Sequence, residues 1–170
     1  EADWESFDLV VIRSTWDYTE RLEEFLAWAD RVGPGRLRNV PDLVRWNTDK
    51  RYLAELDGGG LPVPPTALVA PGGPVPDLGG RVVIKPVSGA GARDTGVFDD
   101  DSRDEAEALI AKLGAQDEIA MIQPYIPWID DRGETAVLFF GGRFAYALRK
   151  RAFLPESGVA PLKPGTTVAA

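Results

Sequence analysis

The chain has 170 residues, of which 44% are hydrophobic and 27% charged, a composition typical of a water-soluble globular protein. It contains no cysteine and no histidine, which excludes disulfide frameworks, zinc centres and serine–histidine or cysteine–histidine hydrolases within this segment. Its net charge of −8 argues against nucleic-acid binding, because affinity for a phosphate backbone requires clustered cations.

The sequence also predicts a cytoplasmic protein with no membrane partner. No stretch approaches the length of a membrane span, and Glu1-Ala2-Asp3 lacks the basic and then apolar pattern of a signal peptide.

Only five of the 19 basic residues are lysines. A lysine in this chain can therefore mark a position that needs a compact point charge, although chance scatter is the plain alternative.

The first forty residues predict the end of an α/β domain. Residues 7–13 form a continuous apolar run, which is typical of a strand buried on both faces. Apolar residues then recur at helical spacing up to Gly33-Pro34-Gly35, at Leu22, Phe25, Leu26 and Ala29. Because a strand opens the chain so abruptly, we expect residues 1–40 to be the C-terminal part of an N-terminal α/β domain.

The next predicted element is a short helix over residues 48–56, with Asn47 as its N-cap. This helix places Lys50 in its first turn, where the macrodipole disfavours a cation. A solvated lysine is the plain explanation, and an anionic ligand that shares the helix N-terminus is the functional one. Trp16-Asp17-Tyr18 and Trp46 are interpreted as packing and capping residues.

A phosphate-binding pattern follows. The apolar strand over residues 82–86 carries Lys85 near its end, a loop of small residues runs from Ser88 through Gly89, Ala90 and Gly91 to Thr95, and residues 96–98 form a second strand. Such a loop lets backbone N–H groups approach an anion, while the ammonium supplies the opposing charge. The plain alternative is a strand-end lysine that reaches solvent beside a flexible turn.

The last part of the chain predicts a helix and three strands. Residues 102–105 form a capping box, and the helix after it presents an apolar face made of Ala106, Leu109, Ile110 and Leu113. Strands are expected over residues 119–123, 135–140 and 144–150, the last two joined as a hairpin across Gly141-Gly142. Residues 152–170 show no period and predict a loop. The elements together indicate a mixed α/β (α+β) fold of two small lobes.

Three groups of residues in this region are candidate ligand contacts. The segment Gln123, Pro124, Tyr125 and Ile126 leaves its strand at a proline, so its backbone meets either the edge of a purine or water. Glu134 is either a solvated acid or an acceptor for ribose hydroxyls. Lys150, Arg149 and Arg151 are either a solvated strand edge or contacts to a transferred phosphoryl group, and we rank Lys150 first.

Taken in order, these elements resemble the ATP-grasp superfamily, and within it the bacterial glutathione-synthetase-like branch. The matching segments are Asn47–Leu53, Val83–Pro86, Ser88–Thr95, Met121–Ile126, Gly133-Glu134 and Phe144–Arg151. The resemblance implies an ATP-grasp domain over residues 41–170 that is incomplete at its C-terminus, with a small ATP lobe at about residues 66–124.

The resemblance also implies a carboxylate–amine ligase that holds ATP between two lobes. Lys50 and Lys85 would contact the α/β-phosphates and the adenine side of the cleft, and the 88–95 loop would close over the phosphates. The backbone of residues 123–126 would read the adenine, Glu134 the ribose, and Lys150 would face the γ-phosphate. A substrate carboxylate would attack that phosphate to form an acylphosphate, which an amine or similar nucleophile then displaces.

One departure from the family concerns the metal. The family binds Mg²⁺ through an acidic residue and a Glu-x-Asn element, and asparagine occurs here only at Asn39 and Asn47. We therefore expect the Mg²⁺ ligands beyond Ala170. The implied partners are ATP and small carboxylate and amine substrates, and a homo-oligomer is compatible with the sequence. The alternative functions are a nucleotide-binding module or degenerate ATP-grasp domain without turnover, and a plain structural domain.

Overall fold

The computed structural model describes residues 2–13, 15, 17–150, 154 and 158–159. The chain divides into two compact units, Glu1–Pro64 with Pro86–Gly91 and Pro65–Lys85 with Ala92–Ala170. The predicted mixed α/β fold class is confirmed, since helices alternate with a parallel strand pair in the first unit and pack on an antiparallel sheet in the second. The division expected near residue 40 stays a prediction.

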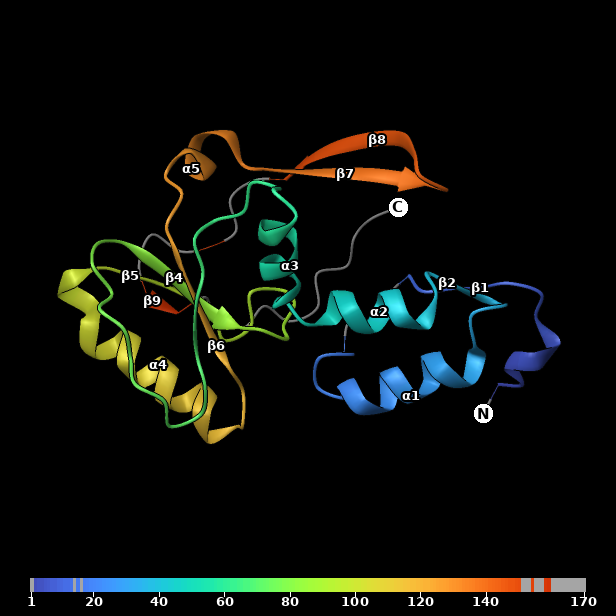
Figure 1. Ribbon diagram of the computed structural model, residues 1–170, viewed down its shortest axis with the longest axis horizontal. Helices are drawn as coiled ribbons and strands as arrows, with labels where there is room; N and C mark the ends of the chain where they lie inside the picture. Colours follow the sequence, from blue (N-terminus) through green and yellow to red (C-terminus); the bar gives the residue numbers. More distant parts are fainter. Residues whose placement is uncertain (1, 14, 16, 151–153, 155–157, 160–170) are drawn as a thin grey trace. The chain divides into compact units, whose positions relative to one another are not determined.

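The first unit begins with a 3-10 turn, η1 (Trp4–Ser6), and a strand–helix–strand arrangement (Figure 1). Strand β1 (Val10–Val11) pairs in parallel with β2 (Leu37–Arg38), and α1 (Leu22–Val32) connects them. Two further helices follow, α2 (Pro41–Thr48) and α3 (Tyr52–Gly58). The buried side chains of this unit are Val10, Leu26, Ala29, Val32, Leu37 and Val44.

The helix predicted after residue 22 is confirmed, and its inward face carries Leu26 and Ala29 as expected. The strand predicted over residues 7–13 is much shorter than expected. Only two of its residues pair, and Phe7, Leu9 and Val11 are 48%, 55% and 61% exposed. The physical reason is that, among the described residues, helix α1 covers the face of β1 that carries Val10, whereas the face that carries Leu9 and Val11 is exposed.

The helix predicted over residues 48–56 is also different. Pro41 begins α2 at a position where a proline has no helical N–H to lose, and Asn47 lies in the last turn of that helix rather than at a cap. Lys50 consequently lies in the turn between α2 and α3. In that turn Asp49 accepts hydrogen bonds from the backbone and side chain of Arg51.

The second unit is built on a five-stranded sheet in the order β3-β6-β4-β5-β9. Its strands are β3 (Ala67–Val69), β4 (Val82–Pro86), β5 (Gly96–Phe98), β6 (Ala120–Pro124) and β9 (Gly158–Val159). The pairs β3–β6, β4–β5 and β5–β9 are antiparallel. Strand β9 falls in the region predicted to be a loop, where it pairs with Gly96 and Val97 of β5.

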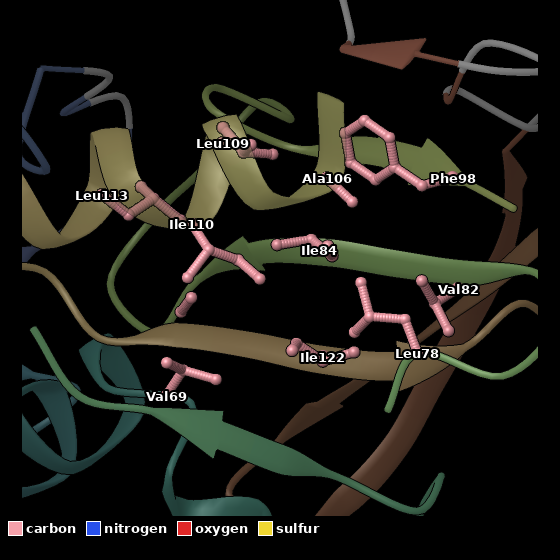
Figure 2. Close-up of a cluster of buried hydrophobic side chains, with 11 residues drawn as sticks. Val69, Leu78, Val82, Ile84, Phe98, Ala106, Leu109, Ile110, Leu113 and Ile122 are labelled. Carbon is pink, nitrogen blue, oxygen red and sulfur yellow. The ribbon is translucent and has the colours of Figure 1, made fainter. Parts of the chain in front are cut away.

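Helix α4 (Arg103–Ala115) covers one face of this sheet, as Figure 2 shows. Its predicted inward residues are buried against strand residues that include Ile84, Phe98 and Ile122. The capping box lies one turn earlier than predicted, because Asp99 and Ser102 form it at the 3-10 turn η2 (Asp100–Ser102). Among the described residues, no helix is both long and apolar enough to cross a membrane.

The predicted hairpin is confirmed at the end of the described chain. After the short helix α5 (Trp128–Arg132), strand β7 (Glu134–Phe140) pairs with β8 (Arg143–Lys150) across Gly141 and Gly142, both of which have positive φ. A bulge between Leu138 and Phe139 shifts the register. Every residue of β8 is exposed, and in β7 only Ala136 and Leu138 are half-buried.

Candidate functional site

Lys50 holds the first half of the small-residue loop, within the first unit. Its backbone N–H donates to the carbonyl of Val87 at 2.9 Å, and its ammonium donates to the carbonyls of Val87 at 3.3 Å and Gly89 at 2.7 Å. Gly89 is needed for this close packing, since an added Cβ there would lie 2.9 Å from the Pro86 ring.

The second half of the loop is anchored separately, within the second unit. Ala92 and Asp94 both have positive φ, a conformation that costs free energy for residues other than glycine. The ammonium of Lys112, on α4, contacts the Asp94 carboxylate at 2.5 Å. This ion pair helps to hold the loop in its unusual backbone path, and it gives a third lysine of the chain a role in the same segment.

Lys85 lies near the end of β4 in a partly buried position. Side chains alternate along a strand, and Val82 and Ile84 face the core under α4, so Lys85 projects from the opposite face of the sheet. Burial lowers the pKa of Lys85 below its ordinary 10.5, because desolvation penalises the ammonium, and the Glu134 carboxylate raises the pKa in part. Lys85 and Glu134 therefore lie close enough to interact.

The hairpin register brings a second lysine to Glu134. Lys150 lies directly opposite Glu134, and Arg149 lies opposite Thr135. The structure thus gathers Lys85, Glu134 and Lys150 within the second unit. Arg151, the third predicted cation of this strand, lies outside the described residues. The three gathered residues carry two positive charges and one negative charge, so an anion would be favoured beside them.

The predicted purine-reading segment is tied down by several contacts. The Gln123 amide donates to the Thr66 hydroxyl at 2.9 Å, and its buried side chain shares the sheet face of Lys85. The Tyr125 N–H donates to the carbonyl of Arg81, whose guanidinium stacks over the tyrosine ring at 3.9 Å. The Tyr125 hydroxyl donates to Asp130. The Tyr125 N–H is already bonded to Arg81, and Pro124 has no N–H. The predicted reading of adenine by residues 123–126 therefore depends on their other backbone N–H and carbonyl groups.

A cavity in the first unit contains residues that the sequence did not single out as ligand contacts. It has a volume of about 490 Å³, and its polar lining includes Arg13, Arg38, Asn39 and Asn47. The signal available in the sequence was the use of asparagine, because both asparagines of the chain line this one cavity. Tyr18 also lines it, although the sequence assigned that residue to packing.

The described residues include no group of three or more acidic side chains that could hold a metal ion.

The chain was compared with known proteins. The family model described as the N-terminal domain of D-cycloserine synthetase DcsG matches residues 1–39. The cycloserine biosynthesis protein DcsG of Streptomyces lavendulae is 40% identical over 168 residues, which cover 92% of this chain and 56% of that protein. The crystal structure of D-cycloserine synthetase DcsG matches with a TM-score of 0.80 and 36% identity, over 94% of this chain and 58% of that chain. This chain is similar to D-cycloserine synthetase.

A D-alanine–D-alanine ligase from Bacillus anthracis also matches, with a TM-score of 0.42 and 19% identity, over 64% of this chain and 42% of that one. The likeness to the crystal structure of D-cycloserine synthetase agrees with the mixed α/β fold predicted from the sequence. The chain spans 56% of the length of the curated relative that it matches. The similarity to D-cycloserine synthetase therefore concerns this segment of that protein.

Proposed function

We propose that this chain is the nucleotide-binding part of an ATP-dependent ligase of ATP-grasp type, which joins a carboxylate to an amine or similar nucleophile. The observation that carries the proposal is the partly buried ammonium of Lys85, which the single carboxylate of Glu134 offsets only in part. Burying a charge costs free energy unless an opposite charge compensates it. The phosphates of ATP would supply that compensation.

The arrangement around the loop supports the same ligand. The Lys50 ammonium already organises the carbonyls of the loop, which leaves the backbone N–H groups of a small-residue segment to face an anion. Lys150, opposite Glu134, adds a second cation at the end of the hairpin. In this proposal Lys50 and Lys85 contact the phosphates, Glu134 accepts the ribose hydroxyls and Lys150 faces the γ-phosphate.

The reaction proceeds in two balanced steps. A carboxylate oxygen of the first substrate attacks the γ-phosphorus of ATP, so that an acylphosphate forms and ADP leaves. The amine nitrogen of the second substrate then attacks the acyl carbon, and inorganic phosphate leaves as the new bond forms. The protein positions the reactants and neutralises charge, which requires no histidine. The similarity to D-cycloserine synthetase supports a small product.

The finer predictions from the sequence belong to this proposal as well. They are the glutathione-synthetase-like branch, the Mg²⁺ ligands beyond Ala170, the reading of adenine by residues 123–126, the contribution of Arg149 and Arg151, the cytoplasmic location and a homo-oligomeric state.

The test uses the full-length protein and compares Lys85→Ala and Lys150→Ala with the unchanged protein. We expect Lys85→Ala to weaken the binding of a non-hydrolysable ATP analogue about tenfold or more, because a charge-assisted contact is lost. We expect Lys150→Ala to slow ADP release more than it weakens binding, because it acts on charge that develops during transfer. Calorimetric titration and an ADP-release assay measure the two quantities.

Arg143→Ala is the matched control, since it removes a cation from the opposite end of the same hairpin. Its binding and turnover should both stay unchanged. Unaltered ATP affinity in Lys85→Ala would overturn the assignment of the loop. Normal ATP binding with no ADP release in the presence of any small carboxylate would favour the nucleotide-binding module instead.

A further inference from the structure

Tyr125 is fixed by contacts with two other segments of the second unit. It directly follows β6, and its backbone N–H donates to the carbonyl of Arg81 at 2.8 Å. The Arg81 guanidinium lies over the tyrosine ring, 3.9 Å from its centroid, and the hydroxyl donates to the Asp130 carboxylate. Tyr125 is only 9% exposed. The phenol side chain therefore connects the segment before β4 with the short helix α5.

Helix α5 has little else to hold it. It has five residues, none of which is buried, and no side chain caps its N-terminus. A helix of this length is not stable by itself in water, because nucleation costs more than one turn of hydrogen bonds returns. The position of α5 therefore depends on tertiary contacts, among which the hydrogen bond between Tyr125 and Asp130 joins it to the sheet.

The end of α5 leads directly into Glu134, as Figure 1 shows for α5 and β7. Gly133 ends the helix with a φ of +67°, and its N–H donates to the carbonyl of Ile129 at 2.8 Å. Glu134 is the next residue and the first of β7. A shift of α5 would therefore displace the Glu134 carboxylate, since no slack lies between them.

The other end of the connection leads to Lys85. Arg81 directly precedes β4, the strand that carries Lys85, and Lys85 and Glu134 interact through their charges. Tyr125 thus links the segment before one member of this pair to the segment before the other. Strand β4 is also held by its pairing with β5, so Lys85 depends less on this link than Glu134 does.

We propose that Tyr125 and Asp130 are positioning residues for the Glu134 carboxylate, and that they set how strongly the site distinguishes the ribose hydroxyls of its nucleotide. This inference rests on the proposed function, in which Glu134 accepts those hydroxyls and Lys85 contacts the phosphates. A hydroxyl donates to a carboxylate only over about 2.5–3.0 Å, so a small displacement of Glu134 removes the contact.

The experiment titrates the full-length protein with a non-hydrolysable ATP analogue and with the 2′,3′-dideoxy form of that analogue. The ratio of the two dissociation constants measures recognition of the ribose hydroxyls. We expect the dideoxy form to bind the unchanged protein about tenfold or more weakly, the usual effect of losing a hydrogen bond to a charged group.

Tyr125→Phe keeps the ring beneath the Arg81 guanidinium and removes only the hydroxyl that reaches Asp130. We expect the ratio to fall to about threefold or less, with the affinity for the dideoxy form changed by less than about twofold, because the ribose contact alone is lost. A purely structural role would change both affinities together and leave the ratio unaltered.

Further variants test the route through Glu134. Glu134→Ala should bring the ratio close to one, and adding Tyr125→Phe to it should lower the ratio no further, because the two residues act on one contact. Asp130→Ala should repeat the effect of Tyr125→Phe, and Asp130→Asn, which keeps an acceptor oxygen, should restore part of the ratio. Tyr146→Phe, which removes a hydroxyl from an exposed tyrosine of β8, is the control and should keep the full ratio.

Thermal unfolding verifies that each variant is folded. The inference is overturned if folded Tyr125→Phe keeps the full ratio, if it binds both forms equally more weakly, or if Glu134→Ala still discriminates between them. In each of these cases ATP-analogue binding that depends on Lys85 would still support the proposed function. Failure of the unchanged protein to bind either form would overturn the proposed function and this inference together.

Discussion

Three of the five lysines of this chain lie in specific environments near the small-residue loop. Arginine serves most surface positions, and these three lysines are Lys50, Lys85 and Lys112. Lys50 contacts loop carbonyls, Lys85 is partly buried before the loop, and Lys112 pairs with Asp94 at its end. The idea that lysine marks positions needing a compact charge agrees with these three environments.

The pKa of Lys85 makes a prediction at this scale. Folding lowers the pKa below 10.5, so the unfolded chain binds more protons between the lowered pKa and 10.5. The contribution of Lys85 to the free energy of unfolding therefore increases as pH rises across that window. In the proposed function ATP binds the charged form of Lys85, so we expect the affinity for an ATP analogue to fall as pH rises through the lowered pKa.

Calorimetric titration of the full-length protein measures this effect. The titrations run from about pH 7 to about pH 10, a range that ends near the ordinary pKa of lysine. Lys85→Arg provides the comparison, because a guanidinium stays charged across the whole range. Its binding profile should be flat where that of the unchanged protein declines. Parallel profiles for the two proteins would show that another group titrates.

At the scale of elements, the sheet of the second unit depends on a glycine. Gly96 and Phe98 project to the same face of β5, and a Cβ at Gly96 would lie 2.5 Å from the buried Phe98 ring and 3.1 Å from the carbonyl of Gly158. A ring that is 1% exposed has little room to move. The short β5 therefore tolerates no side chain at its first position.

We expect Gly96→Ala to lower the free energy of unfolding by about 1–3 kcal/mol, the usual cost of overpacking. Gly79→Ala is the control, because no heavy atom lies within 4 Å of its Cβ position and its φ is not positive. Urea denaturation of the full-length protein compares the two variants. Equal stability of Gly96→Ala and Gly79→Ala would mean that the Phe98 ring repacks without strain.

The hairpin sets the charge arrangement at one of its ends. Its strands were predicted within one residue from the alternation of residues and from Gly141-Gly142. The pairing of Glu134 with Lys150 was not predicted, because a register requires both strand ends and the bulge at Leu138 to be known. A shift of one residue would have placed Arg149 opposite Glu134 instead.

At the scale of the whole molecule, the hairpin of β7 and β8 stands out among the described residues for its exposed apolar side chains. The hairpin exposes six large hydrophobic side chains, Val137, Phe139, Phe140, Phe144, Tyr146 and Leu148, each by 45% or more. By the strand register, Val137 projects to the opposite face of the hairpin from Tyr146 and Leu148, so both faces carry exposed apolar side chains. Exposed apolar surface of this extent marks an interaction site.

We expect the 170-residue chain to bind a fluorescent dye that reports exposed apolar surface. Replacement of Phe140 and Phe144 by serine should reduce the signal severalfold, because these are the most exposed aromatic residues of the hairpin. Replacement of the exposed Leu61, in the first unit, is the control and should change the signal little. A signal unchanged by the double substitution would place the dye-binding surface elsewhere.

The sequence by itself determined the small-residue loop with its flanking lysine, helix α4 and strands β4 to β8 of the second unit, but it missed α5 and predicted a loop where β9 forms. Those features follow from local periodicity and from the conformations that glycine and proline allow, both of which are read from neighbouring residues. It misplaced the helix boundary near Asn47 and overestimated the first strand, because burial depends on which partner strands are present.

Only the tertiary structure decided which distant residues meet. Lys50 contacts Gly89, 39 positions further along the chain. Glu134 approaches Lys85, and Asn39 and Asn47 line one cavity. Such pairings depend on chain topology and strand register, which no local pattern encodes. The chemistry proposed here arises from those encounters, since charge and burial act through space rather than along the chain.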